Sequence, residues 1–139
     1  MTNTRFGIEI EMTGITRETA ANTIANHLGG TVQRTYNSYD CYKVTAPDDR
    51  EWQIMSDGSI TCQRKENGRT VPASREYSVE LVSPILTYTN DIETLQELVR
   101  KLRKAGVCRS LSSHPANRES KRVVILQDRT GSPPSPSGG

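Results

Sequence analysis

The sequence has few apolar and few aromatic residues for a chain of its length. Of its 139 residues, 33% are hydrophobic and 5% are aromatic, and no aromatic residue follows Tyr88. Soluble domains hold about 45–50% apolar residues, on a count that includes glycine instead of tyrosine, so part of this chain is expected not to pack. The length predicts one domain with a modest core.

Long apolar runs and an excess of one charge are also absent. No stretch approaches the ~20 apolar residues of a membrane-spanning helix, and 18 basic residues against 16 acidic ones leave a net charge of +2. Whole-chain charge therefore favours neither nucleic acid nor a membrane as a partner. The polar first five residues are not typical of a signal peptide, so we expect a soluble protein that is not exported.

Several motifs with known chemistry are missing. Cys41, Cys62 and Cys108 show no C-x-x-C spacing, which argues against a disulfide framework or a zinc ribbon and favours a reducing cytoplasm. Neither His27 nor His114 is a convincing partner for a cysteine nucleophile. The sequence also lacks the phosphate-binding loop, the dinucleotide fingerprint, the H-E-x-x-H helix and the G-x-S-x-G elbow.

The clearest pattern present is an alternation of apolar and non-apolar residues over residues 5–13, R-F-G-I-E-I-E-M-T. At strand period Glu9 and Glu11 share one face, about 7 Å apart at their Cα atoms. Glutamate is a poor strand former, and like charges on one face repel unless a cation or solvent screens them. The pair indicates either a cation site or the solvated face of an amphipathic strand.

Two helices are predicted. Thr16 can cap a helix that ends at Gly29-Gly30, and we interpret His27 in its last turn as a surface residue, not a ligand. The second helix is expected over residues 90–105, with capping-box spacing between Asn90 and Glu93.

The residues between the helices predict an antiparallel meander. Strand patterns occur at 31–36, 39–45, 51–56, 59–64 and 76–83, with a hairpin-type turn at Asp57-Gly58. The expected fold class is α+β: an antiparallel sheet with two helices packed on one face, in a domain over residues 1–106. Residues 107–139 are rich in Ser, Arg and Pro and are expected to form an unstructured tail, in which only residues 123–126 suit a short strand or helix.

Segments in fixed order carry a resemblance to a known family. They are R-F-G-I-E-I-E-M-T at 5–13, W-Q-I-M-S-D-G-S-I at 52–60, V-E-L-V-S-P-I-L at 79–86 and a helix end R-K-L-R-K-A-G at 100–106. Together they resemble the N-terminal part of the amidoligases, carboxylate-amine ligases related to glutamine synthetase and glutamate-cysteine ligase.

This resemblance implies a glutamine synthetase-like sheet whose acidic face binds magnesium and ATP. The implied reaction activates a carboxylate of a small molecule or peptide as an acyl phosphate, which an amine then attacks. Glu9, Glu11 and Glu80 are the implied metal ligands, of the hard oxygen type that magnesium prefers. Asp57 and Ser59 are implied to line the substrate or nucleotide cleft, although a plain turn role for Asp57 before Gly58 stays equally open.

The sequence departs from the family pattern after Gly106. Relatives are expected to show a strand of the type Cys-Gly-Ile-His-Val-His, whereas residues 108–115 here read C-R-S-L-S-S-H-P, as after a change of reading frame. We therefore expect a truncated ligase that binds magnesium weakly and is inactive without an oligomer or completing partner. A non-catalytic remnant or partner-binding module is the alternative. A nucleic-acid-binding module is least favoured: only the cluster from Lys101 to Lys104 and the arginines of the tail favour it, and the basic face rich in aromatic residues that such modules need is not evident.

Overall fold

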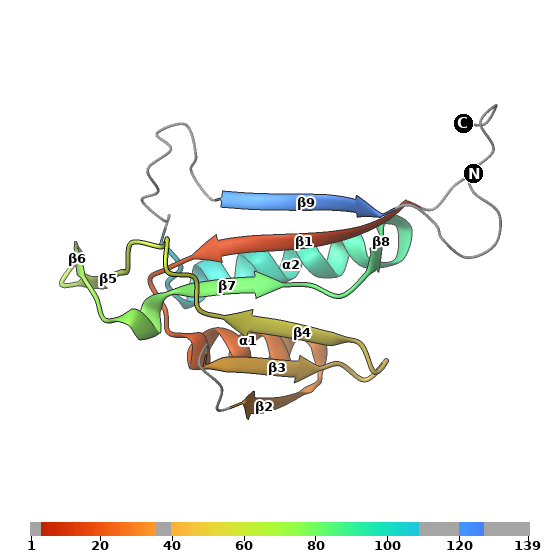
Figure 1. The fold of residues 1–139 in the computed structure, drawn as a ribbon, viewed down its shortest axis with the longest axis horizontal. Helices are drawn as coiled ribbons and strands as arrows, with labels where there is room; N and C mark the ends of the chain where they lie inside the picture. Colours follow the sequence, from red (N-terminus) through yellow and green to blue (C-terminus); the bar gives the residue numbers. More distant parts are fainter. Residues whose placement is uncertain (1–3, 36–39, 109–119, 127–139) are drawn as a thin grey trace.

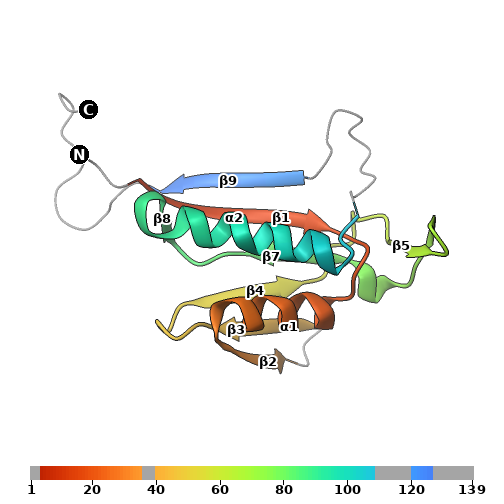
Figure 2. The same cartoon turned by 180° about the vertical axis from the view of Figure 1, so that it is seen from behind.

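The computed structural model describes residues 4–35, 40–108 and 120–126. Within them one sheet has the strand order β2-β3-β4-β7-β1-β8, and β9 pairs with the other edge of β1. Both described helices lie on the same face of this sheet, as the two opposite views show (Figures 1 and 2). The sheet elements are β1 (Arg5–Met12), β2 (Thr31–Thr35), β3 (Cys41–Thr45), β4 (Glu51–Met55), β7 (Val79–Val82), β8 (Leu86–Thr87) and β9 (Ser120–Leu126); the helices are α1 (Arg17–Leu28), α2 (Tyr88–Ala105) and the 3₁₀ turn η1 (Arg75–Tyr77).

Every described pairing in this sheet is antiparallel. A separate hairpin joins β5 (Gln63–Glu66) to β6 (Arg69–Pro72). The expected α+β class, with an antiparallel sheet and two helices on one face, is confirmed. No helix of the described ranges has the length and apolar character needed to cross a bilayer.

The core lies between the sheet and the helices. Buried and half-buried residues alternate along β1 without a break, so one face of the strand belongs to the core and the other does not. The buried cluster comprises Phe6, Ile8, Ile10, Met12, Ile15, Ala20, Ala21, Ile24, Ala25, Tyr42, Val44, Trp52, Ile54, Val79, Leu81, Leu86, Leu95, Leu98 and Leu102.

Helix α1 begins and ends where the sequence predicts. The Oγ1 atom of Thr16 accepts a hydrogen bond from the Thr19 N–H at 3.1 Å. Gly29 ends the helix with φ at 73°, a left-handed conformation that glycine adopts without strain. His27 stays at the surface, where its Nε2 lies 3.1 Å from the carbonyl oxygen of Thr94 in α2.

Helix α2 begins earlier than predicted, and the Asn90–Glu93 capping box is wrong. The helix starts at Tyr88 after the N-cap Thr87. The Asp91 carboxylate reaches back to accept the Thr87 N–H at 2.8 Å. The same carboxylate binds both terminal nitrogens of Arg50 at 2.8 and 3.1 Å, which joins the start of α2 to the residue before β4. Asp91, and not Glu93, binds the N-terminal N–H because a second partner, Arg50, fixes the Asp91 side chain.

Strands β7 and β8 pair with the same edge of β1, with a break at Pro84. The register shifts by one residue between Glu9↔Val82 and Phe6↔Leu86. At the break the Ser83 N–H donates to the Ile8 carbonyl at 3.0 Å, and the Ser83 hydroxyl accepts the Ile8 N–H at 2.9 Å. The serine side chain thus replaces a backbone acceptor where the strand bends.

The expectation of an unstructured tail fails for two stretches. Val107 packs against the core, and the Cys108 N–H donates to the Thr13 carbonyl at 2.8 Å. Residues of β9 pair with β1 from Arg5↔Leu126 to Glu11↔Ser120. The apolar run in β9 covers a strand edge that would otherwise be exposed. The rest of the predicted tail, 109–119 and 127–139, lies outside the described residues.

Candidate metal site on the open face of the sheet

One face of the sheet is turned away from the helices (Figure 1). Since Ile8, Ile10 and Met12 of β1 belong to the core, the alternating Glu9 and Glu11 lie on the opposite, open face. Glu9 and Glu11 are half-buried and alternate with the buried Ile8, Ile10 and Met12. Across the ladder, Glu11 lies directly opposite Glu80 of β7, and Glu80 in turn lies opposite Met55 of β4. Two carboxylates therefore occupy one cross-strand position.

The ladder geometry brings these two carboxylates close. Ile8 bonds to Ser83 through both its N–H and its carbonyl, so in an alternating antiparallel ladder Ile10 also bonds toward β7, while Glu9 and Glu11 do not. Glu11 and Glu80 thus form a non-hydrogen-bonded pair, the type with the shorter Cα separation of about 4.5 Å. Like charges in this position destabilise a sheet.

A third carboxylate comes from the turn after β4. Asp57 follows the end of β4 by two residues, and its Oδ1 accepts hydrogen bonds from the N–H and hydroxyl of Ser59 at 2.9 and 2.8 Å. One carboxylate oxygen from each of Glu11, Asp57 and Glu80 lies within 4.8 Å of the others, and all three residues are half-buried. The turn thus adds its acid to the cross-strand pair.

The chemistry of this donor set fits a hard divalent cation. Each donor is a carboxylate oxygen, and the group contains neither His nor Cys. Such a set suits magnesium, calcium or manganese better than zinc. Three like charges at this spacing repel one another, and a bound cation would convert that repulsion into attraction.

The structure groups the predicted site residues differently from the sequence analysis. Glu11 and Glu80 come together, and Asp57 joins them, although the sequence placed Asp57 in the substrate or nucleotide cleft. Glu9 lies on the same face but opposite Val82 and Arg122, outside this group. Ser59 lies beside Asp57. That any of these residues binds a metal stays a prediction.

Sequence reasoning missed the polar residues behind the site. Arg17 and Ser78 are buried, with exposed fractions of 7% and 0%, and no motif in the sequence drew attention to them. The strand expected at 59–64 is wrong for residues 59–62, because β5 begins at Gln63. Hydrogen bonds from Arg75 to the carbonyls of Asp57 and Ile60 hold the residues before β5 in a turn instead.

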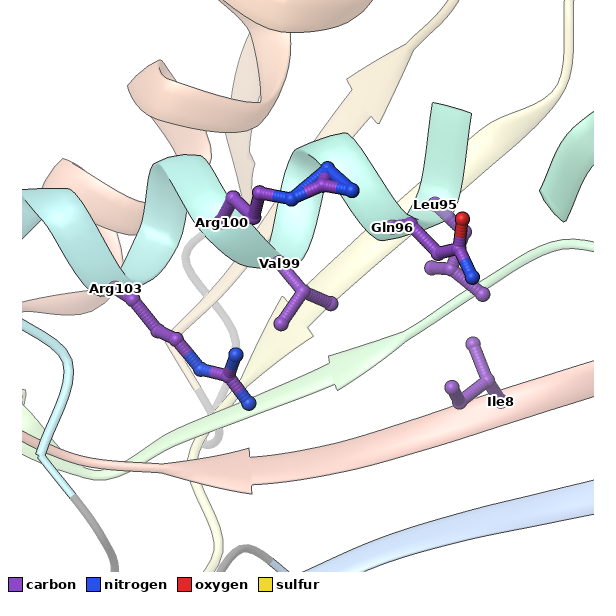
Figure 3. Close-up of a pocket in the computed structure, with 6 residues that line it drawn as sticks. All are labelled: Ile8, Leu95, Gln96, Val99, Arg100 and Arg103. Atoms are coloured by element: carbon purple, nitrogen blue, oxygen red, sulfur yellow. The ribbon is translucent and has the colours of Figure 1, made fainter. Parts of the chain in front are cut away.

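A groove of about 340 Å³ lies elsewhere, on the helix side of the sheet. Figure 3 shows Ile8 of β1 facing Leu95 and Val99 of α2, with Arg100 and Arg103 further along the helix. Another hollow of about 400 Å³ lies around Arg50, His27 and Asp91. Neither is lined by Glu11, Asp57 or Glu80, so we locate the candidate site from its donor groups and not from these hollows.

The fold and the site define an α+β protein with a carboxylate cluster on the open face of an antiparallel sheet. Residues 2–114 match a family model described as "Putative amidoligase enzyme". The match covers most of the chain, which therefore belongs to this amidoligase family. No curated protein and no solved structure gives a significant match.

Proposed function

We propose that this chain is the metal- and nucleotide-binding part of an ATP- and magnesium-dependent carboxylate-amine ligase. The observation that carries the proposal is the convergence of Glu11, Asp57 and Glu80 on the open face of the sheet, in a chain that belongs to the amidoligase family. Magnesium commonly binds through a few carboxylates and the phosphates of a nucleotide, which is the arrangement that such a half-open cluster can serve.

In this proposal Glu11 and Glu80 hold the ion from two neighbouring strands, and Asp57 holds it from the adjoining turn. A bound magnesium ion would neutralise charge on the nucleotide phosphates as the acid is activated. The strands give two ligands a rigid support. Ser59 fixes the Oδ1 atom of Asp57 and, with Asp57, borders the proposed cleft for nucleotide or substrate.

The wider features of the family resemblance belong to the same proposal. They are a sheet of the glutamine synthetase type, an acyl-phosphate intermediate, and carboxylate and amine substrates that are small molecules or peptides. A cytoplasmic location agrees with the thiols of Cys41, Cys62 and Cys108, which are all free.

Activity of this chain by itself is not expected. Three carboxylates fill part of an octahedral magnesium shell, and water or phosphate must supply the rest. Residues 108–115 replace the His-bearing strand that the family resemblance implies. We therefore propose weak magnesium binding, with ligation dependent on a second copy or a completing partner.

Calorimetric titration of magnesium tests the metal site. Wild type should bind, whereas Glu11→Gln, Asp57→Asn and Glu80→Gln should each lower the affinity roughly tenfold or more. Glu51→Gln is the matched control, since Glu51 is an exposed acid in β4 of the same sheet. Glu9→Gln decides the membership of Glu9: a loss equal to that of Glu11→Gln would restore the set implied by the resemblance. Equal binding by all variants would show that the acids form only a solvated face.

A second experiment separates the ligase from the alternative of a non-catalytic remnant. Nucleotide binding is measured with a non-hydrolysable ATP analogue, with and without magnesium. Magnesium-dependent binding that is lost in Glu80→Gln supports the ligase proposal. Magnesium binding without any nucleotide binding favours the remnant.

A further inference from the structure

Ser78 lies directly before β7 and has no exposed surface. Its hydroxyl donates to the Asp57 carbonyl at 2.7 Å and accepts the Asp57 N–H at 2.9 Å. One side chain therefore binds both backbone polar groups of a single residue. The residue so held carries the one carboxylate of the cluster that comes from a turn and not from a strand.

Arg75 holds the same turn from its exposed side. Its Nη2 donates to the Asp57 carbonyl at 3.0 Å, and its Nη1 donates to the Ile60 carbonyl at 2.9 Å. The Asp57 carbonyl thus receives hydrogen bonds from both Ser78 and Arg75. The N–H of Ile60 also donates to it, at 3.2 Å. The backbone of the turn is fixed independently of the carboxylate.

The buried Arg17 fixes the backbone of both Ser78 and Arg75. Nη1 of Arg17, the first residue of α1, donates to the carbonyls of Arg75 and Ser78 at 2.9 and 2.8 Å. Its Nη2 forms an ion pair with the Asp40 carboxylate at 3.0 Å. Hydrogen bonds from Arg34 and Arg17 hold the pKa of Asp40 below its ordinary value, so the charge of the buried guanidinium has a lasting partner.

The position of Ser78 relates the turn to the strand of Glu80. Ser78 precedes Glu80 by two residues, and Glu80 lies opposite Glu11. The hydrogen bonds between Ser78 and Asp57 therefore fix the turn relative to β7, which carries Glu80 and pairs with β1, the strand of Glu11. At the far end of the side chain, Ser59 holds Oδ1 of Asp57. Ser78 thus fixes the backbone of Asp57, and Ser59 fixes its carboxylate.

We infer that Ser78, assisted by Arg75, is a positioning residue that sets the Asp57 carboxylate against Glu11 and Glu80 for binding a divalent cation. The inference rests on the proposed metal-binding function of this cluster. Its physical basis is that residues which orient metal ligands change metal affinity although they do not touch the ion. Ser78 does not contact the ion. It restricts Asp57 beforehand, so Asp57 loses less conformational entropy when the ion binds.

The test compares Ser78→Ala with Ser83→Ala. Both serines lie at an end of β7, and both use the hydroxyl as a backbone hydrogen-bond partner, but Ser83 binds Ile8 and not the turn. Magnesium affinity is measured by calorimetry, and the spectrum of bound manganese by electron paramagnetic resonance, at a temperature where circular dichroism shows both variants folded. Ser78→Ala should lower the magnesium affinity roughly tenfold or more and broaden the manganese spectrum, whereas Ser83→Ala should change neither.

Two further variants distinguish the possible failures. In an Asp57→Asn background, Ser78→Ala should cause no additional loss of affinity, because the group it positions is already gone. If Asp57→Asn binds magnesium as wild type does, the proposed function fails. If Asp57→Asn loses binding while Ser78→Ala binds as wild type, the positioning role alone is overturned.

Arg75→Gln keeps the inference open to disproof if Ser78→Ala does not fold. Arg75 is exposed, so its replacement leaves the core intact while removing a donor to the Asp57 carbonyl. A severalfold lower magnesium affinity supports the inference, and an unchanged affinity in this variant, with Ser78→Ala unfolded, overturns it. Arg69→Gln, an exposed arginine in β6, serves as the charge-matched control.

Discussion

The two faces of β1 differ in what they contribute. On one face Ile8, Ile10 and Met12 are buried under the helices, and the burial of their apolar surface stabilises the fold. On the other face Glu11 lies opposite Glu80, an arrangement of like charges that destabilises a sheet. The covered face is explained by folding alone. The open face brings together carboxylates that a bound cation could join, and the proposed function rests on this face.

The largest expected effect is on the covered face. Leu98 of α2 is fully buried, and Leu98→Ala should lower the free energy of unfolding by ~2–5 kcal/mol, measured by urea denaturation. Glu93→Ala, at an exposed position of the same helix, should change it by less than ~0.5 kcal/mol. Under folding conditions magnesium affinity should not change in either variant. An unchanged denaturation midpoint for Leu98→Ala would contradict the packing of α2 on the sheet through Leu98.

The covered face was also the more predictable one. Strand and helix periods in the sequence decide which residues turn toward the core, and the Thr16 cap and the Gly29 end follow from local chemistry. The periods do not decide which strand lies beside which. The acidic group contains Asp57 and not Glu9 because β4 pairs with β7 and because Ser78 forms long-range hydrogen bonds with Asp57. Sequence patterns could not predict these contacts.

The same limit explains β9 and the start of α2. The partner of the apolar run at 123–126 is the edge of β1, more than a hundred residues earlier in the chain. At α2, capping-box spacing fitted Asn90 and Glu93, but Asp91 has a second partner, Arg50, that is distant in sequence. Local patterns decided the type of element and distant contacts decided its exact position.

The second prediction concerns the ion pair between Arg50 and Asp91, which joins the end of the β3–β4 turn to the start of α2. The hydrogen bond from Arg50, followed by those of Thr87, holds the pKa of Asp91 below its ordinary value of 3.8. A lowered pKa in the folded state means that this stabilisation is complete above the unfolded value and is lost as the pH falls through the folded one. Asp91→Asn should therefore cost ~1–3 kcal/mol near pH 7 and much less in strong acid.

Denaturation of wild type and variant between pH 7 and pH 2 measures this dependence. Asp48→Asn is the control, because Asp48 contacts the same arginine but is half exposed and should contribute less than ~1 kcal/mol. A stability difference between wild type and Asp91→Asn that stayed constant down to pH 2 would contradict the role given to the carboxylate.

The third prediction tests the edge that β1 shares with β9. The amides of Glu9 and Glu11 point toward β9, while that of Ile10 points toward β7. In a chain ending at Arg118, hydrogen exchange of the Glu9 and Glu11 amides should accelerate at least roughly tenfold, with a smaller change at Ile10. If the Glu9 and Glu11 amides already exchange much faster than the Ile10 amide in the full chain, and the truncation changes neither, the pairing of β9 with β1 is contradicted.

The smallest expected effect is on the open face, and its sign is the opposite of the others. Without metal, Glu80→Gln removes a like charge facing Glu11, so it should stabilise the fold by ~0.2–1 kcal/mol. Glu51→Gln, an acid opposite Thr45, provides the control and should have little effect. With saturating magnesium the order should reverse, because a ligand that binds the folded state alone stabilises wild type and not the variant. Thermal unfolding of the two proteins with and without magnesium decides the matter: a crossing of their stabilities identifies acids retained for a ligand, and parallel curves identify an ordinary solvated face.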